Sequence, residues 1–89
     1  MTIQELKLKI KTLPTEEAIR ILSDYISDNP SSDEALTMRG MKYWSTDQRS
    51  LAINDYLAAI RINPDSTARL ALQASQDILN YYNKDLYNP

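Results

Sequence analysis

Apolar side chains recur every three or four residues along most of this chain, which is the spacing of one face of an α-helix. The first stripe is formed by Ile3, Leu6, Ile10 and Leu13. Thr2 and Glu5 have the spacing of a capping box at its start, where side chain and backbone satisfy each other's hydrogen bonds. The pattern predicts a first helix that ends near Pro14, which either closes it or opens the next one.

A second apolar stripe follows Pro14 and is formed by Ala18, Ile19, Leu22, Tyr25 and Ile26. Thr15 is expected to cap this helix, because a threonine oxygen can accept a hydrogen bond from a free backbone N–H. The segment DNPSSDE, residues 28–34, ends it, since the residue before a proline disfavours the α-conformation. The serines of that segment can cap a following helix.

Three more helices are predicted after this break, at 33–45, about 48–62 and about 66–82, separated by STDQ and NPDS. No segment shows the alternation that is typical of a half-buried strand. The predicted fold is therefore all-α, with about five antiparallel helices in one domain over residues 1–89.

The second half of the sequence repeats the first. Pro30 and Pro64 lie 34 residues apart, and the same offset relates Ala18 to Ala52, Ile19 to Ile53, Leu22 to Tyr56, Ile26 to Ile60 and Asn29 to Asn63. A period of this length predicts helix pairs that stack on one another.

The best-preserved positions of the repeat are Gly40, Tyr43, Ala52, Tyr56, Ala59 and Pro64. Their residue types and spacing resemble the tetratricopeptide repeat, a family of stacked helix pairs. Leu36 stands where that family often has tryptophan, and Arg39 where leucine is usual. The resemblance divides the chain into a degenerate repeat (1–32), a well-matched repeat (33–66), and a capping helix with a tail (67–89).

The only glycine of the chain lies inside a predicted helix, where glycine costs about 1 kcal/mol relative to alanine. The resemblance implies that Gly40 leaves room for the ring of Tyr56 on the neighbouring helix. We therefore expect Gly40→Leu to be destabilising. The alternative is that Gly40 only frays or ends its helix.

Composition restricts the chemistry that the chain can carry. With 43% apolar residues and few glycines and prolines, the chain is expected to fold. It has no cysteine and no histidine, which excludes disulfides and thiolate sites and removes the commonest general base. The net charge of −2 does not fit nucleic-acid binding. Acidic residues such as Asp55 and Asp77 are interpreted as solvated or capping groups, so we expect no catalytic residue, metal or cofactor.

In tetratricopeptide repeats the first helix of each pair lines a concave groove that binds peptides or protein segments. The resemblance implies that the groove of this chain is lined by Gln4, Leu8, Lys11, Thr37, Met41, Trp44, Ser45, Ala71, Ser75 and Ile78. Trp44 either faces this groove or packs near Ile10 and Leu13 as part of the core. The predicted function is a non-catalytic module that binds a protein or peptide partner, and the alternative is a structural protein that self-associates as a homo-oligomer.

Both ends of the sequence carry further expectations. The first residues alternate charged and apolar side chains and lack the apolar run of a signal peptide or membrane span, so we expect a cytoplasmic protein without membrane contact. The aromatic tail, with Tyr81, Tyr82 and Tyr87, is expected to fold over the last helix and seal it.

Overall fold

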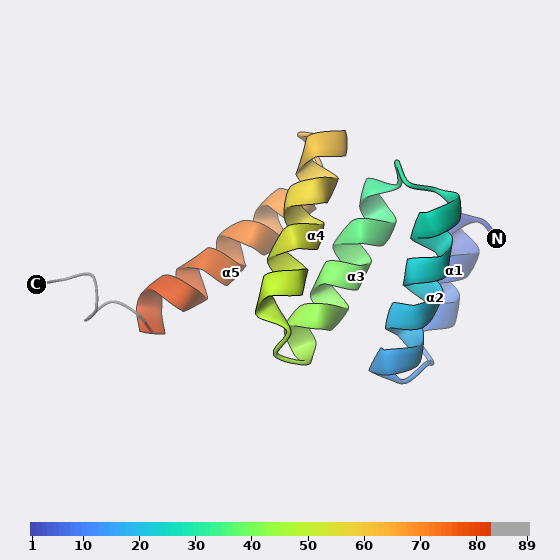
Figure 1. Ribbon diagram of the computed structural model, residues 1–89, viewed down its shortest axis with the longest axis horizontal. Coiled ribbons are helices and arrows are strands. Elements are labelled where there is room, and N and C mark those ends of the chain that lie inside the picture. The colour runs from blue at the N-terminus through green and yellow to red at the C-terminus, as the bar shows by residue number, and fades with distance from the viewer. Residues whose placement is uncertain (83–89) are drawn as a thin grey trace, which may run out of the picture.

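The computed structural model describes the backbone of residues 1–82 and the side chains of residues 1–78. This part of the chain forms five helices: α1 (Ile3–Ile10), α2 (Thr15–Asp28), α3 (Asp33–Ser45), α4 (Arg49–Ile62) and α5 (Ala68–Tyr82). Helices that follow each other in the chain pack against each other, and α3 also contacts α5 (Figure 1). The predicted all-α fold is confirmed. The predicted seal by the aromatic tail concerns Tyr81, Tyr82 and Tyr87, which lie outside the described side chains.

Two of the predicted helix caps are confirmed and one is wrong. The side chain of Thr2 accepts a hydrogen bond from the backbone N–H of Glu5, and Ser32 accepts one from Ala35. The return bond of the predicted capping box differs, because the Glu5 carboxylate accepts from the hydroxyl of Thr2 at 3.2 Å and not from its backbone N–H. Thr15 caps nothing, because it is already the first residue of α2, and Pro14 occupies the cap position without a side-chain hydrogen bond. The fixed φ of Pro14 already suits the entrance of a helix, so the helix starts one residue earlier than a threonine cap would allow.

The core consists of two clusters that share α3. The first lies between α1, α2 and α3 and contains Leu6, Ile10, Ala18, Leu22 and Ala35. The second lies between α3, α4 and α5 and contains Leu36, Ala52, Tyr56, Ala59 and Ala68. Ala35 and Leu36 of α3, together with Ile26 of α2, which packs against both clusters, join the two parts of the core.

Gly40 lies in the middle of α3, where it is buried against Tyr56. A Cβ atom on Gly40 would lie 2.6 Å from Cε1 and 2.8 Å from Cδ1 of the Tyr56 ring. Its φ is not positive, so this glycine provides space rather than an unusual backbone conformation. The predicted packing of Tyr56 over Gly40 is confirmed, and the alternative of a frayed helix end is wrong.

An ion pair that the sequence analysis missed joins three helices. Arg39 on α3 donates two hydrogen bonds to the carboxylate of Asp55 on α4, from Nε and Nη2, both at 2.8 Å. Its Nη1 donates a third, at 3.1 Å, to the hydroxyl of Ser23 on α2. The interpretation of Asp55 as a solvated or capping residue is wrong, since its side chain is only 8% exposed.

The guanidinium of Arg39 also lies over the ring of Tyr43, at 5.6 Å from its centroid. The hydrogen bonds to Asp55 raise the pKa of Arg39 above its ordinary value, although partial burial acts in the opposite direction. The charged form is thus favoured inside the stack. Arg39 therefore joins α3 to α2 and α4 by polar contacts, at a position where the tetratricopeptide repeats that the sequence resembles usually have leucine.

Candidate protein-interaction groove

Two adjoining depressions lie along α3, and Met41 lines both of them. The first, called here the polar depression, has a volume of about 360 Å³ and lies between α1, α3 and the turn from α4 to α5. The second, called the apolar hollow, has a volume of about 240 Å³ and lies between α3 and α5. Because they adjoin at Met41 and their α3 lining runs from Asp33 to Trp44, the two depressions together are called here the groove.

The apolar hollow is lined by three helices. Its lining consists of Met41, Trp44, Tyr56, Ala71, Ala74, Ser75 and Ile78. The α5 residues recur at spacings of three or four, so they share one face of that helix. The small size of Ala71, Ala74 and Ser75 leaves room in front of Tyr56. Met41 is 55% exposed and Ile78 41% exposed, which leaves a large apolar surface in contact with water.

Trp44 is half-buried and packs against the second core cluster, which contains Tyr56 and Ala68. The guanidinium of Arg49 lies over the indole ring of Trp44, at 5.1 Å from the ring centroid. The contacts of Trp44 place it with the cluster of α3, α4 and α5. Neither Ile10 nor Leu13, the core neighbours considered for Trp44, belongs to that cluster.

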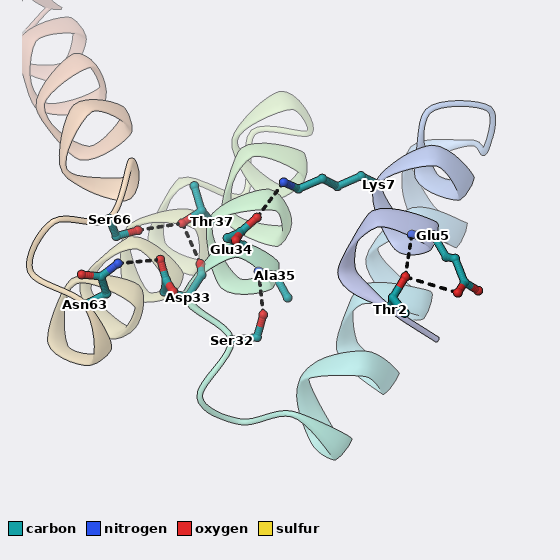
Figure 2. A network of polar contacts seen from close by, with 10 residues as sticks. All are labelled: Thr2, Glu5, Lys7, Ser32, Asp33, Glu34, Ala35, Thr37, Asn63 and Ser66. Carbon is teal, nitrogen blue, oxygen red and sulfur yellow. Dashed lines mark hydrogen bonds and ion pairs between the residues drawn. The ribbon is translucent and has the colours of Figure 1, made fainter.

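Polar contacts hold the walls of the polar depression in place (Figure 2). Lys7 reaches from α1 to Glu34 on α3, with Nζ and Oε2 2.6 Å apart. Asn63, after α4, donates to the carboxylate of Asp33 at 3.4 Å. The two buried hydroxyl oxygens of Thr37 and Ser66 lie 3.4 Å apart. These contacts tie α1 and the turn before α5 to the first turns of α3.

The charges along this groove are unevenly distributed. Asp33, Glu34, Asp65 and Lys7 line the polar depression, so three carboxylates face one ammonium group. The apolar hollow has no charged lining residue, and beyond it Arg49 covers Trp44 and lies 3.9 Å from the carboxylate of Asp47. The groove thus runs from an acidic end to an apolar segment.

Five of the predicted groove residues come together around the apolar hollow: Met41, Trp44, Ala71, Ser75 and Ile78. Thr37 lines the polar depression, but it is buried and its hydroxyl donates to the backbone of Asp33. Ser45 is exposed at the end of α3, donates to the carbonyl of Lys42 and lines neither depression.

The residues predicted from α1, which are Gln4, Leu8 and Lys11, are exposed and line neither depression. Lys7 lines the groove instead. That prediction assumed a turn near Pro14 that is one residue short. In the structure α2 and α4 have bounds 34 residues apart, and the same offset relates Lys7 to Met41. A strict 34-residue alignment would have found Lys7.

Metal sites, membrane-spanning helices and similar proteins were also considered. Within residues 1–82 no three acidic residues lie close enough together to hold a metal ion. No helix in the same range has the length and the apolar character needed to cross a bilayer. Searches with this chain against family models, curated proteins and solved structures found no match.

Tyr56, which lines the apolar hollow, leads us to expect a loss of stability at alkaline pH. Burial, helped by the nearby charge of Asp55, raises the pKa of Tyr56 above its ordinary value of 10.0. The folded state therefore prefers the neutral phenol of Tyr56. The contribution of this phenol to stability is complete below the pKa of the unfolded state, near pH 10, and is lost as the pH rises through the pKa of the folded state. We expect urea unfolding to show this fall and Tyr56→Phe to reduce it. An equally steep fall in Tyr56→Phe would contradict the assignment to Tyr56.

Proposed function

We propose that this chain is a non-catalytic protein-interaction module of the tetratricopeptide type, which holds a peptide segment of a partner protein along α3. The observation that carries the proposal is the apolar hollow, where methionine, tryptophan and isoleucine side chains stay accessible to water around small residues of α5. Methionine adapts its shape to different ligands, and tryptophan is a frequent anchor of binding energy.

The position of the hollow supports the same proposal. Both depressions are lined mainly by α1, α3 and α5, the first helices of their repeats, which form the concave groove in the family that the sequence resembles. A hollow of this size accommodates one large apolar side chain. The partner is therefore expected to present a single leucine, isoleucine, methionine or phenylalanine, with its flanking backbone lying along α3.

A substitution that fills the hollow tests this proposal. Ala74 is exposed on α5 and lines the hollow, so Ala74→Leu should occupy the space without disturbing the core. The matched control is Gln73→Leu, because Gln73 is exposed on the same helix and lines a different depression. Peptides selected against the immobilised whole protein from a displayed random library would be measured by anisotropy and by Trp44 emission.

We expect binding to weaken about tenfold or more in Ala74→Leu, a loss of about 1.4 kcal/mol or more. Gln73→Leu should leave binding unchanged, and bound peptides should shift the emission of Trp44, the only tryptophan. Selected peptides that bind both variants equally well would place binding elsewhere and contradict the proposal.

Self-association is the second candidate function, and a neighbouring depression along α5 favours it. Leu70 is 71% exposed there and lines, with Ile60 and Leu72, a depression of about 590 Å³. Light scattering over a concentration series distinguishes the two candidates. A dimer that Leu70→Ser disperses, together with no peptide that is sensitive to Ala74→Leu, would favour self-association. The cytoplasmic location remains a prediction from the sequence.

A further inference from the structure

We infer that the segment bound in this groove is basic: a lysine or arginine enters the polar depression, and a large apolar side chain about five residues away enters the apolar hollow. This inference rests on the proposed function, because it specifies the chemistry of the partner for the same groove. It comes from the distribution of charge along α3 and from the distance between the two depressions.

Two carboxylates of the polar depression remain for a ligand. Glu34 is engaged by Lys7 at 2.6 Å, so these two charges compensate each other. Asp33 and Asp65 also line the depression, and neither takes part in an ion pair within the described residues. Asp65 is exposed and Asp33 half-buried, so a cation entering from solvent meets a net charge of −2.

The two buried hydroxyl groups of the depression do not compete for this role. The oxygens of Thr37 and Ser66 lie 3.4 Å from each other, and the hydroxyl of Thr37 also donates to the carbonyl of Asp33. The Ser66 oxygen in turn accepts from the backbone N–H of Ala68. The strongest acceptors that face the depression are therefore carboxylates, which favour ammonium and guanidinium donors and repel acidic groups.

The difference in charge between the two ends of the groove fixes the orientation. At the far end Arg49 lies over Trp44, and its Nη2 lies 3.9 Å from the carboxylate of Asp47, so these two charges offset each other. A cationic side chain is therefore attracted at the acidic end, and the basic residue of the ligand lies toward Asp33. The apolar anchor then falls in the hollow.

The geometry of α3 sets the spacing between the basic residue and the anchor. Asp33 and Trp44 are eleven residues apart, which corresponds to about 16 Å along a helix that rises 1.5 Å per residue. An extended segment covers about 3.3 Å per residue, so about five residues span this distance. A helical ligand would need about eleven residues for the same distance, so the two backbone conformations predict different spacings.

The inference is tested with synthetic peptides that share one leucine anchor and differ at a single position five residues away, which holds lysine, glutamine or glutamate. We expect the lysine peptide to bind about two- to fivefold more tightly than the glutamine peptide, as for exposed ion pairs, and the glutamate peptide to bind most weakly. The difference should shrink as salt rises from about 0.05 M to about 0.5 M, because salt screens exposed charges.

A variant of the protein assigns the effect to the groove. Asp65→Asn should remove most of the preference for lysine and leave the affinity for the glutamine peptide unchanged. Asp24→Asn is the matched control, because Asp24 is exposed on α2, lines neither depression and gives the same change in net charge. Circular dichroism of both variants checks that they remain helical.

The outcomes separate the inference from the proposed function. If anchored peptides bind in a manner sensitive to Ala74→Leu but show no preference for lysine, or prefer glutamate, the inference is wrong and the proposed function stands. A preference for lysine that Asp65→Asn and Asp24→Asn reduce equally would also overturn the inference, since net charge alone would explain it. If no peptide of any charge is sensitive to Ala74→Leu, the proposed function itself fails.

Discussion

Replacing Gly40 with alanine is expected to lower the free energy of unfolding by about 1–3 kcal/mol, the usual cost of overpacking a core. In an ordinary helix interior the same change raises stability by about 0.5–1 kcal/mol. Here the new Cβ would lie 2.6 Å from Cε1 of Tyr56 and 3.1 Å from the carbonyl oxygen of Ala52, so the buried ring of Tyr56 or the two helices must shift. Gly40→Leu should cost more than Gly40→Ala. Urea melts followed by circular dichroism measure both changes.

The control for this prediction is the same substitution in a chain that carries Tyr56→Leu. Without the ring the added methyl group has room, so Gly40→Ala should be neutral or stabilising there. The difference between the two backgrounds measures the coupling of residues 40 and 56. Equal effects in both backgrounds would contradict the role of Gly40 as the space for Tyr56.

Breaking the ion pair between Arg39 and Asp55 is expected to have the largest effect in the molecule. Asp55→Leu should lower the free energy of unfolding by about 3 kcal/mol, the low end for a buried pair, because Arg39 is 21% exposed and keeps some water. Arg39→Leu should cost more, since the carboxylate that it leaves behind is only 8% exposed. The same urea melts measure both variants.

Two further variants make this prediction specific. The double variant Arg39→Leu with Asp55→Leu should be close to the parent or more stable, because apolar packing can replace a buried ion pair. Lys7→Ala breaks the exposed contact with Glu34 and should cost less than about 1 kcal/mol. A double variant that is as unstable as the worse single variant would show that the ion pair is needed in a way that apolar side chains cannot replace.

The helices could be predicted to within a few residues because apolar periodicity and two Asn-Pro turns mark them independently. The contact of Gly40 with Tyr56 was also predictable, since the repeat resemblance assigns both positions. The ion pair was missed because Arg39 and Asp55 lie on different helices and nothing local connects them. The one signal in the sequence was the charge of Arg39 at a position where tetratricopeptide repeats usually have leucine.

The groove was predictable in part. Met41 and Trp44 were placed by the well-matched repeat, whereas the residues of α1 were placed by an alignment that assumed a shortened turn. The hollow itself depends on the small sizes of Ala71 and Ala74 and on the direction in which α5 runs past α3. The sequence of α3 or of α5 alone therefore does not determine its shape. Uneven charge along α3 also arises from residues of the turn before α5, which periodicity does not position.

Contact between consecutive helices also shapes how this chain folds. Residues that pack together are close in sequence, and three residues connect α3 to α4, so closing that hairpin costs little loop entropy. Folding is then expected to start with α3 and α4 and to spread outward, at the rates of other helical proteins with local contacts. Within the described residues, the helices added last, α1 and α5, pack against the rest of the stack from one side, so they should open first in native-state exchange. Because these two helices are also the outer walls of the groove, its width is set by the parts of the protein with the lowest local stability.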